Sequence, residues 1–312
     1  MAIVLIIGGF CLLALPAVAR RLGRSLDPAE WSRLCAALLG GGAVVFELAL
    51  VLMALPLVAR AVGFPELAHV CERMLGVMAP ASRPVGWAAA VGAGIVPALA
   101  LRGLGQAWRT QRRFRIEPEL GEHRPCGSHE LVVLPIDALI AVSVGGLPGQ
   151  IVLSQGLVDA LSPAEVTAVV RHEAAHLEHD HHRFLLLAAA VEAAFGFVPL
   201  VRRSVVACRT ALERWADEDA ASGHEHGRST VRSALMGVAL AAASPAVAAF
   251  TGVDDVVERL DALQVPTPRP SALRRLAIYA PILVVSFVVL VGIGAWVGHT
   301  RAMLAMAGPC PT

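Results

Sequence analysis

Four long apolar stretches constrain this chain more than any other feature of its sequence. A transmembrane helix needs about 20 mostly apolar residues, and the stretches cover about residues 2–19, 34–58, 85–101 and 278–297. Only 16% of the 312 residues are charged, and the mean hydropathy is +0.65. Soluble domains carry about 25% charged residues. The sequence therefore predicts a mainly α-helical integral membrane protein with four transmembrane helices.

Arginines orient these predicted spans. All 26 basic residues are Arg, and many of them gather in three of the segments that flank the spans. The positive-inside rule assigns such segments to the cytoplasm, which with four spans puts the N-terminus outside. No basic residue precedes the first apolar stretch, so we expect a retained span rather than a cleaved signal peptide. The groups are Arg20, Arg21, Arg24 and Arg33; Arg102, Arg109, Arg112, Arg113 and Arg115; and Arg274 and Arg275.

The spans divide the chain into three regions. We expect a membrane region with three helices at residues 1–104 and a cytosolic domain at residues 105–275. The last helix and a short external tail follow at residues 276–312. The predicted protein is thus a multi-pass cell-membrane protein whose soluble domain is inserted before the last helix.

The soluble domain shows both strand and helix signals. Apolar runs at residues 131–134, 139–144 and 150–153 predict three short β-strands. Ser162 is followed by Pro163 and, three residues after Ser162, by Glu165, which is the pattern of a capping box at the start of a helix. We therefore expect an α+β domain.

The capped helix leads into the motif HExxH. His172 and His176 are four residues apart, so both imidazoles lie on one helix face and can bind a single Zn²⁺. Glu173, beside the first histidine, is placed to take a proton from a water that zinc activates. The motif predicts a catalytic zinc site.

A catalytic zinc needs a third protein ligand. Glu213, on a later predicted helix, is the expected ligand, and Glu218 is the alternative. Asp217 follows Glu213 by one helical turn and is expected to hydrogen-bond a ligand imidazole. The three histidines that follow the motif are interpreted as solvated or structural: His179, His181 and His182.

Together these motifs resemble those of membrane-bound gluzincins. The similar run extends from Val152-Leu153-Ser154 through HExxH to Asp180, and then to Glu213 and Ala216-Asp217. It resembles the BlaR/MecR-type metallopeptidase family, number fifty-six, and is similar to the neighbouring HtpX and CAAX-prenyl-protease family, number forty-eight. The resemblance implies one Zn²⁺ per chain. It implies the ligands His172, His176 and Glu213, the general base Glu173 and the supporting acid Asp217.

The expected function is that of a membrane-embedded zinc endopeptidase at the cytoplasmic membrane face. Its partners would be the lipid bilayer and a peptide or protein substrate, without direct nucleic-acid binding. The resemblance implies either cleavage of a cytoplasmic repressor in a signalling relay or removal of damaged membrane proteins, and the sequence leaves both open.

Two alternatives are an intramembrane protease of the site-two type and a non-catalytic zinc-containing scaffold. The many charges at residues 171–183 oppose the first, and Glu173, which a structural zinc site does not need, opposes the second.

Several finer expectations follow. The apolar run 184–201 should not cross the bilayer, because the candidate ligands flank it and a crossing would separate them by about 30 Å. The sequence leaves open whether this run or residues 234–250 enter the membrane.

A substrate peptide should pair beside residues 150–153. Candidates for stabilising an oxyanion are His224, His226 and Arg228, and candidates for an external disulfide, unless both are free thiols, are Cys71 and Cys310.

Overall fold

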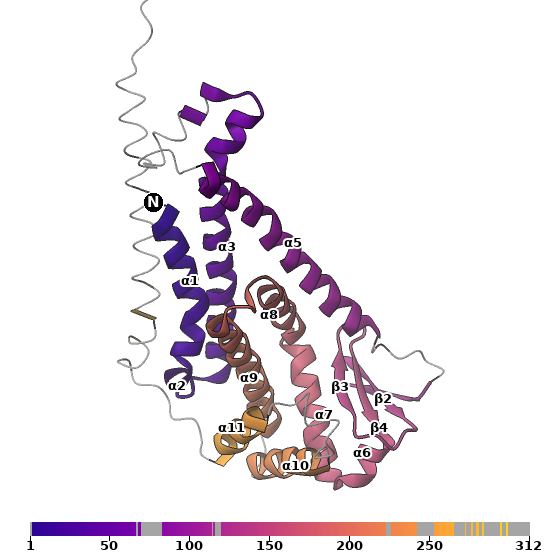
Figure 1. Ribbon diagram of the computed structural model, residues 1–312. Coiled ribbons are helices and arrows are strands. Elements are labelled where there is room, and N and C mark those ends of the chain that lie inside the picture. The colour runs from indigo at the N-terminus through magenta and orange to yellow at the C-terminus, as the bar shows by residue number, and fades with distance from the viewer. Residues whose placement is uncertain are drawn as a thin grey trace, which may run out of the picture.

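The structure is a computed structural model that combines a bundle of long helices with a small β-sheet (Figure 1). It describes residues 2–66, 68–69, 83–113, 115, 120–222, 226–241 and 253–264, together with isolated positions after residue 264. The predicted fourth span at residues 278–297 lies almost entirely outside the described residues, as do Cys71 and Cys310. Within the described residues the prediction of four transmembrane helices is therefore not confirmed.

Three apolar helices occupy the positions of the first three predicted spans. They are α1 (Ala2–Val18), α3 (Pro28–Ala61) and α5 (Arg83–Arg113), and the short α2 (Arg20–Gly23) connects the first two. Among the described residues, α3 and α5 are long and apolar enough to cross a membrane, and α1 is a shorter apolar helix. Helix α5 continues beyond the expected domain boundary at residue 104 and ends near the sheet (Figure 1).

Helices α1 and α3 pack in close backbone contact. A Cβ atom added to Gly9 would lie 2.8 Å from the backbone nitrogen of Phe46, and one added to Gly42 would lie 2.9 Å from the carbonyl oxygen of Gly9. Small residues at such a crossing let two apolar helices approach closely. The sequence thus builds a tight hairpin from its first two apolar helices.

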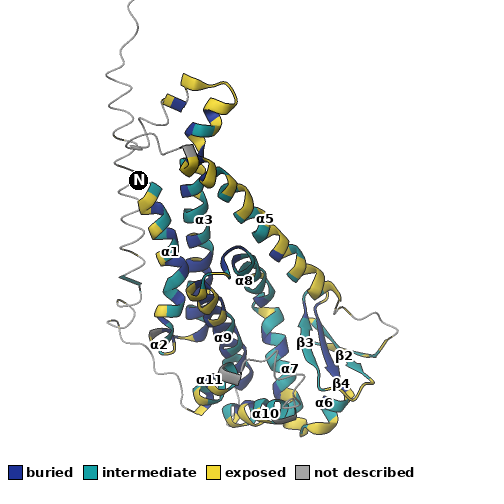
Figure 2. Cartoon of the chain, in the orientation of Figure 1, coloured by how far each residue is buried: buried dark blue, intermediate teal, exposed yellow. Residues whose placement is uncertain are grey.

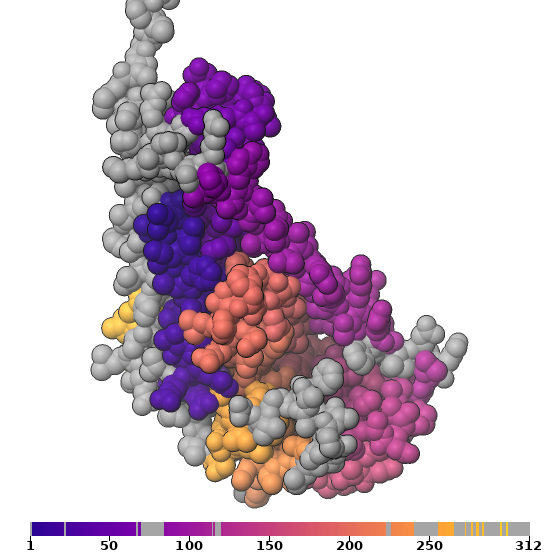
Figure 3. Space-filling model, viewed as in Figure 1, coloured from indigo at the N-terminus to yellow at the C-terminus, as the bar shows by residue number. Residues whose placement is uncertain are grey.

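A second helical hairpin fills the space beside these helices. Helix α8 (His181–Phe195) is followed by α9 (Pro199–Ala221), and the chain reverses between them. In the space-filling view this hairpin lies between α1 and α5 (Figure 3). The rings of Phe10, Phe46 and Phe195 meet edge to face, with centroids 5.0 and 5.3 Å apart. The run 184–201 is therefore not one continuous helix, because α8 ends at Phe195 and α9 begins at Pro199.

The sheet has four strands in the order β1-β2-β4-β3. Strand β4 pairs parallel with β2, and the other two pairings are antiparallel. Three of the strands were expected from the sequence, whereas β1 was not. Their bounds are β1 (Glu122–Cys126), β2 (His129–Leu134), β3 (Ala141–Val144) and β4 (Gln150–Ser154).

One expectation about this sheet is wrong. Strand β4 lies between β2 and β3, so a peptide cannot pair beside residues 150–153. All five of its residues are buried, as is typical of a central strand. Within the described chain, the unpaired edge beside β4 belongs instead to its neighbour β3.

The helix that carries HExxH lies between the sheet and α9 (Figure 1). After α6 (Gln155–Ala160), helix α7 (Pro163–Glu178) begins at the predicted capping box. The backbone N–H of Ser162 donates to Glu165 Oε2 at 2.8 Å, and the N–H of Glu165 donates to Ser162 Oγ at 3.4 Å. Helix α10 (Gly227–Ala241) packs against α7 and α9, and helix α11 (Val253–Gln264) packs against α9 and α10.

Candidate metal centre

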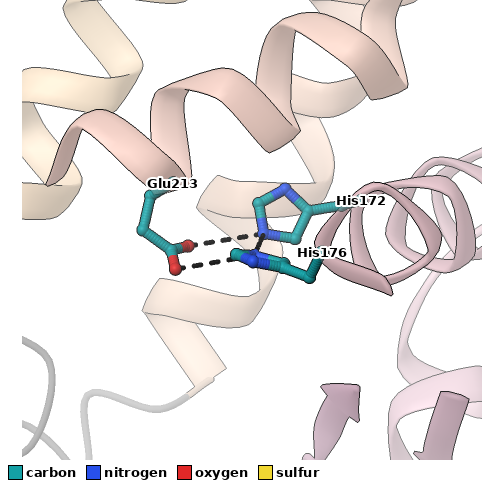
Figure 4. A group of neighbouring side chains, drawn as sticks. All are labelled: His172, His176 and Glu213. Atoms are coloured by element: carbon teal, nitrogen blue, oxygen red, sulfur yellow. Dashed lines mark hydrogen bonds and ion pairs between the residues drawn. The ribbon is translucent and has the colours of Figure 1, made fainter. Parts of the chain in front are cut away.

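His172, His176 and Glu213 converge on one point, although Glu213 comes from a different helix (Figure 4). The two imidazoles lie one turn apart on α7, and the carboxylate reaches them from α9. One potential ligand atom from each residue lies within 4.8 Å of the other two. Both histidines and the expected third ligand are thus brought together by the fold.

The spacing of these atoms suits a zinc ion. The two Nε2 atoms are 3.2 Å apart, and the Glu213 oxygens lie 3.4 Å from Nε2 of His172 and 3.6 Å from Nε2 of His176. Ligands at about 2.05 Å from a tetrahedral zinc are separated by about 3.3 Å. The donor set of two imidazoles and one carboxylate is also that of a catalytic zinc site with one open position. The residues present therefore fit the ion.

Asp217 contacts His172, the first candidate ligand. The Nδ1–H of His172 donates to Asp217 Oδ1 at 3.0 Å, which leaves Nε2 facing the convergence point. Asp217 is only 2% exposed. A carboxylate behind a ligand imidazole fixes its tautomer and its ring orientation. Asp217 thus contacts a candidate ligand and lies outside the ligand triangle itself.

Arg259 of α11 stabilises both carboxylates, and sequence reasoning missed it. Its Nε and Nη2 atoms each donate to Asp217 at 2.8 Å, and Nη1 lies 3.0 Å from Glu213 Oε2. Burial alone would raise the pKa of Glu213 and Asp217, but Arg259 and the neighbouring histidines hold the pKa of both carboxyl groups below its usual value. Both groups are therefore ionised in the buried site.

The metal-free site favours a proton on His172. Burial lowers the pKa of this imidazole, but the hydrogen bonds to Asp217 and Glu213 outweigh burial and raise its pKa to about 10. Because an imidazole must lose a proton from one nitrogen to coordinate a metal, an ion that binds here displaces that proton. The two carboxylates thus favour a positive charge at this site, carried by either a proton or a metal.

Glu173 is buried on α7 next to the first candidate ligand. The side chain is 9% exposed, which is unusual for a carboxylate. A buried carboxylate adjacent in sequence to a metal ligand is the expected arrangement for a general base of an HExxH site. Glu173 is not part of the ligand triangle.

His181 is a second functional candidate that sequence reasoning underrated. It is fully buried, and its Nδ1 lies 2.9 Å from Nδ1 of His176. Burial and the neighbouring histidines lower the pKa of His181 to about 3, so its ring is neutral. A neutral Nδ1 can accept the Nδ1–H of His176 and leave His176 Nε2 for a metal. The only signal in the sequence is its position five residues after His176.

Other polar candidates lie outside the triangle. Glu218, the alternative ligand, is ion-paired with Arg228. His179 lies 3.4 Å from Asp219 and stacks on Trp215, with ring centroids 4.6 Å apart. Because its carboxylate pairs with Arg228, Glu218 is not one of the three residues that converge on the candidate metal site.

The remaining predicted residues also have local roles or lie beyond the description. Asp180, the acidic residue at the end of the similar run, has a left-handed backbone (φ 54°). Its carboxylate lies 3.2 Å from Arg183, and Asp180 is not part of the ligand triangle. His182 lies 3.8 Å from Asp180. His224 lies outside the described residues, and the backbone of His226 accepts hydrogen bonds at the start of α10.

Comparison with known proteins supports the chemistry of this site. Residues 127–251 match the model of peptidase family M48, while no curated protein and no solved structure matches the chain significantly. The matched segment contains both helices of the ligand triangle but ends before Arg259. It corresponds to the HtpX-like family of the two resemblances and does not confirm the BlaR/MecR-type assignment. With this domain the chain is a metallopeptidase, a hydrolase that acts on peptide bonds.

Proposed function

We propose that this protein is a zinc endopeptidase embedded in the cell membrane, with its active site at the cytoplasmic face. The observation that carries the enzymatic part is the convergence of His172, His176 and Glu213 beside the buried carboxylate of Glu173. The roles proposed for these residues are three metal ligands and one general base. Asp217 acts through His172, whose ring it orients.

Each residue of the site has a task in peptide hydrolysis. A zinc ion held by His172, His176 and Glu213 would supply Lewis-acid chemistry: it would lower the pKa of a water towards neutrality and polarise the peptide carbonyl. Glu173 takes the proton of the attacking water and transfers it to the leaving amine. Asp217 and His181 hold the two imidazoles in the orientation that exposes Nε2. Arg259 keeps Glu213 and Asp217 ionised and in place.

A substrate peptide fits the free edge of the sheet. Strand β3 is the outer strand on the side of β4, and it packs against α7. An extended peptide can add to such an edge through main-chain hydrogen bonds. We therefore infer that the substrate pairs with β3, in place of the β4 pairing expected from the sequence.

Low burial of the long helices supports a membrane location. In the most apolar windows of α3 and α5, only 28% and 11% of the residues are buried inside the structure. Helix α5 presents exposed residues along most of its length (Figure 2). A core helix of a soluble protein would be mostly buried, whereas lipid-facing helices keep apolar side chains at the surface. These helices favour membrane insertion, with α1 and residues 278–297 as the other two spans.

The arginine-rich end of the helices supports the cytoplasmic orientation. Arg214, which follows Glu213, donates to the backbone carbonyl of Arg24 at 3.2 Å. The metal centre therefore lies at the same end of the helices as the first arginine group. Tyr279, at the start of the predicted last span, donates to Glu30 near the beginning of α3 at 2.7 Å, which agrees with that span starting at this end. The positive-inside rule assigns this end to the cytoplasm.

Two physiological roles fit this proposal, regulatory proteolysis and quality control of membrane proteins. The family resemblance implies both a cytoplasmic repressor and damaged membrane proteins as candidate substrates. The site-two type fits poorly, because the ligand helix α7 packs against a β-sheet. A non-catalytic scaffold fits poorly because it has no use for the buried Glu173.

Zinc content and hydrolysis of a generic protein substrate, measured on the purified full chain, test the function. We expect one zinc per chain in the wild type and in Glu173→Gln, whose activity should fall about 10³-fold because the general base is lost. Glu213→Ala should lose both zinc and activity. Glu218→Ala is the matched control and should keep both. Full zinc and activity in Glu213→Ala would contradict the assignment.

A further inference from the structure

An ion-pair cluster outside the metal centre connects the first two apolar helices to α11. Glu258 of α11 has a side chain that is 7% exposed. Its carboxylate accepts hydrogen bonds from Nε and Nη2 of Arg24 at 2.9 and 2.7 Å, and another from Arg20. Both arginines belong to the connection that joins α1 to α3. A buried carboxylate is thus satisfied by two guanidinium groups from a distant part of the chain.

The residue next to Glu258 is Arg259, which contacts the metal centre. Arg259 donates two hydrogen bonds to Asp217 and pairs with Glu213. Adjacent residues of α11 therefore contact the α1–α3 connection on one side and the carboxylates of the metal centre on the other. Glu258 and Arg259 belong to the same short helix. A shift of α11 would therefore move Arg259 relative to Glu213.

A second contact joins the same connection to α9. Arg214 is 5% exposed, and its guanidinium donates to the carbonyl oxygen of Arg24. Arg214 directly follows the candidate ligand Glu213. Arg24 therefore contacts both α9, which carries Glu213 and Asp217, and α11, which carries Arg259. It contacts α9 through its backbone carbonyl and α11 through its side chain.

We propose that Arg20, Arg24 and Glu258, here called the Glu258 clamp, form a positioning element of the metal centre. The clamp holds α11 so that Arg259 orients Glu213 and Asp217, and it makes the geometry of the site depend on the position of the first membrane hairpin. This inference rests on the proposed zinc peptidase function. Arg20 and Arg24 are partly exposed, with 32% and 51% of their side chains accessible, whereas Glu258 is buried. Loss of the arginines would leave the buried carboxylate without its partners, which is unfavourable.

The test compares two neutralising substitutions in the full chain in detergent or nanodiscs. Glu258→Gln removes the clamp charge with little change in shape. Arg21→Gln is the matched control, because Arg21 is exposed in the same connection. The measurements are zinc retention against a chelator, kcat and KM, and hydrogen exchange of residues 212–217 in metal-free protein. The double variant Arg24→Glu/Glu258→Arg restores an ion pair with reversed charges.

We expect Glu258→Gln to bind zinc about 10-fold more weakly and to lower kcat about 10-fold, as for other residues that orient metal ligands. KM should stay within about twofold, because the proposed substrate edge at β3 lies on the other side of α7 from α11 (Figure 1). Exchange at residues 212–217 should become faster, and the double variant should recover at least half of the lost zinc affinity.

Zinc retention and kcat in Glu258→Gln equal to those of Arg21→Gln would overturn the clamp. A wild-type chain that neither retains zinc nor cleaves peptides would instead refute the proposed function. The clamp is then decided by hydrogen exchange alone: unchanged exchange at residues 212–217 in metal-free Glu258→Gln rules it out, and faster exchange supports it.

Discussion

The two halves of α9 lie in different surroundings, and the comparison shows how the metal centre is held. The first half packs against α1 and α3 through apolar or small side chains such as Val201, Val205 and Cys208. The second half carries Glu213 and Asp217 and faces the imidazoles of α7. Both halves are largely buried, but the first is held by apolar packing and the second by directed ion pairs. One continuous helix therefore connects the apolar bundle to the proposed metal ligand Glu213.

Overpacking the contact between α5 and α8, the helix that precedes α9, should give the largest effect on stability. A Cβ atom at Gly103 of α5 would lie 2.5 Å from Cβ of Ala193 and 2.6 Å from the carbonyl oxygen of Ala189 in α8. We expect Gly103→Leu to lower the free energy of unfolding by about 3 kcal/mol, since backbone must move to admit the side chain. Gly105→Leu is the control, because a Cβ atom there has nothing within 4 Å.

Denaturant unfolding in detergent measures this difference. Equal stability of the two leucine variants would show that α5 does not hold the α8–α9 hairpin in the way the contact indicates. If Gly103→Leu also weakens zinc binding, the transfer of position along α9 is supported directly.

Removing the partner of His176 tests the metal half. His181→Ala should weaken zinc binding about 10- to 100-fold, because His176 loses the group that accepts its Nδ1–H. His182→Ala, at the neighbouring position, should leave zinc binding unchanged. His181→Asn, whose side-chain oxygen can accept the same hydrogen bond, should recover part of the affinity.

Competition with a chelating dye gives these affinities. A zinc affinity in His181→Ala that matches the wild type would mean that His176 needs no partner. The contact between the two histidines would then have only a packing role.

The smallest effect should come from the cap of α7, which lies at the opposite end of the helix from His176. Ser162→Ala removes the side chain that accepts the N–H of Glu165 and should cost about 1 kcal/mol of stability. Zinc affinity should not change, because the ligands lie on later turns that are held by α9 and the sheet. Thermal unfolding together with a zinc titration checks both statements, and a parallel loss of zinc would show that the cap also sets the ligand geometry.

Local patterns in the sequence predicted much of this molecule. The cap of α7 and the spacing of HExxH depend on residues within one or two helical turns, so they could be recognised without a fold. The apolar runs that became α1, α3 and α5 were equally evident. Glu213 was proposed as a ligand because an acidic residue one turn before Asp217 suits a ligand and its supporting acid, and the structure brings Glu213 to the two histidines. The local structure could be predicted where the relevant partners are close in sequence or share one helix.

Contacts between distant segments could not be predicted in the same way. Arg259 lies 42 residues after Asp217, and the sequence between them gives no sign that they pair. Strand β4 pairs parallel with β2, although β3 lies between them in the sequence. Residues 150–153 alone therefore could not show that β4 is a central strand of the sheet. His181 was seen as a solvated or structural histidine, because its burial results from packing against α9.

The sequence by itself determined the kind of chemistry and the helices that carry it. Helical periodicity places His172 and His176 on one face, and apolar length defines the candidate membrane helices, since both depend only on neighbours along the chain. Only the tertiary structure decided which distant charges surround the ligands. A buried carboxylate needs partners wherever packing supplies them, and here α11 and the α1–α3 connection supply Arg259 for Asp217 and Arg24 for Glu258.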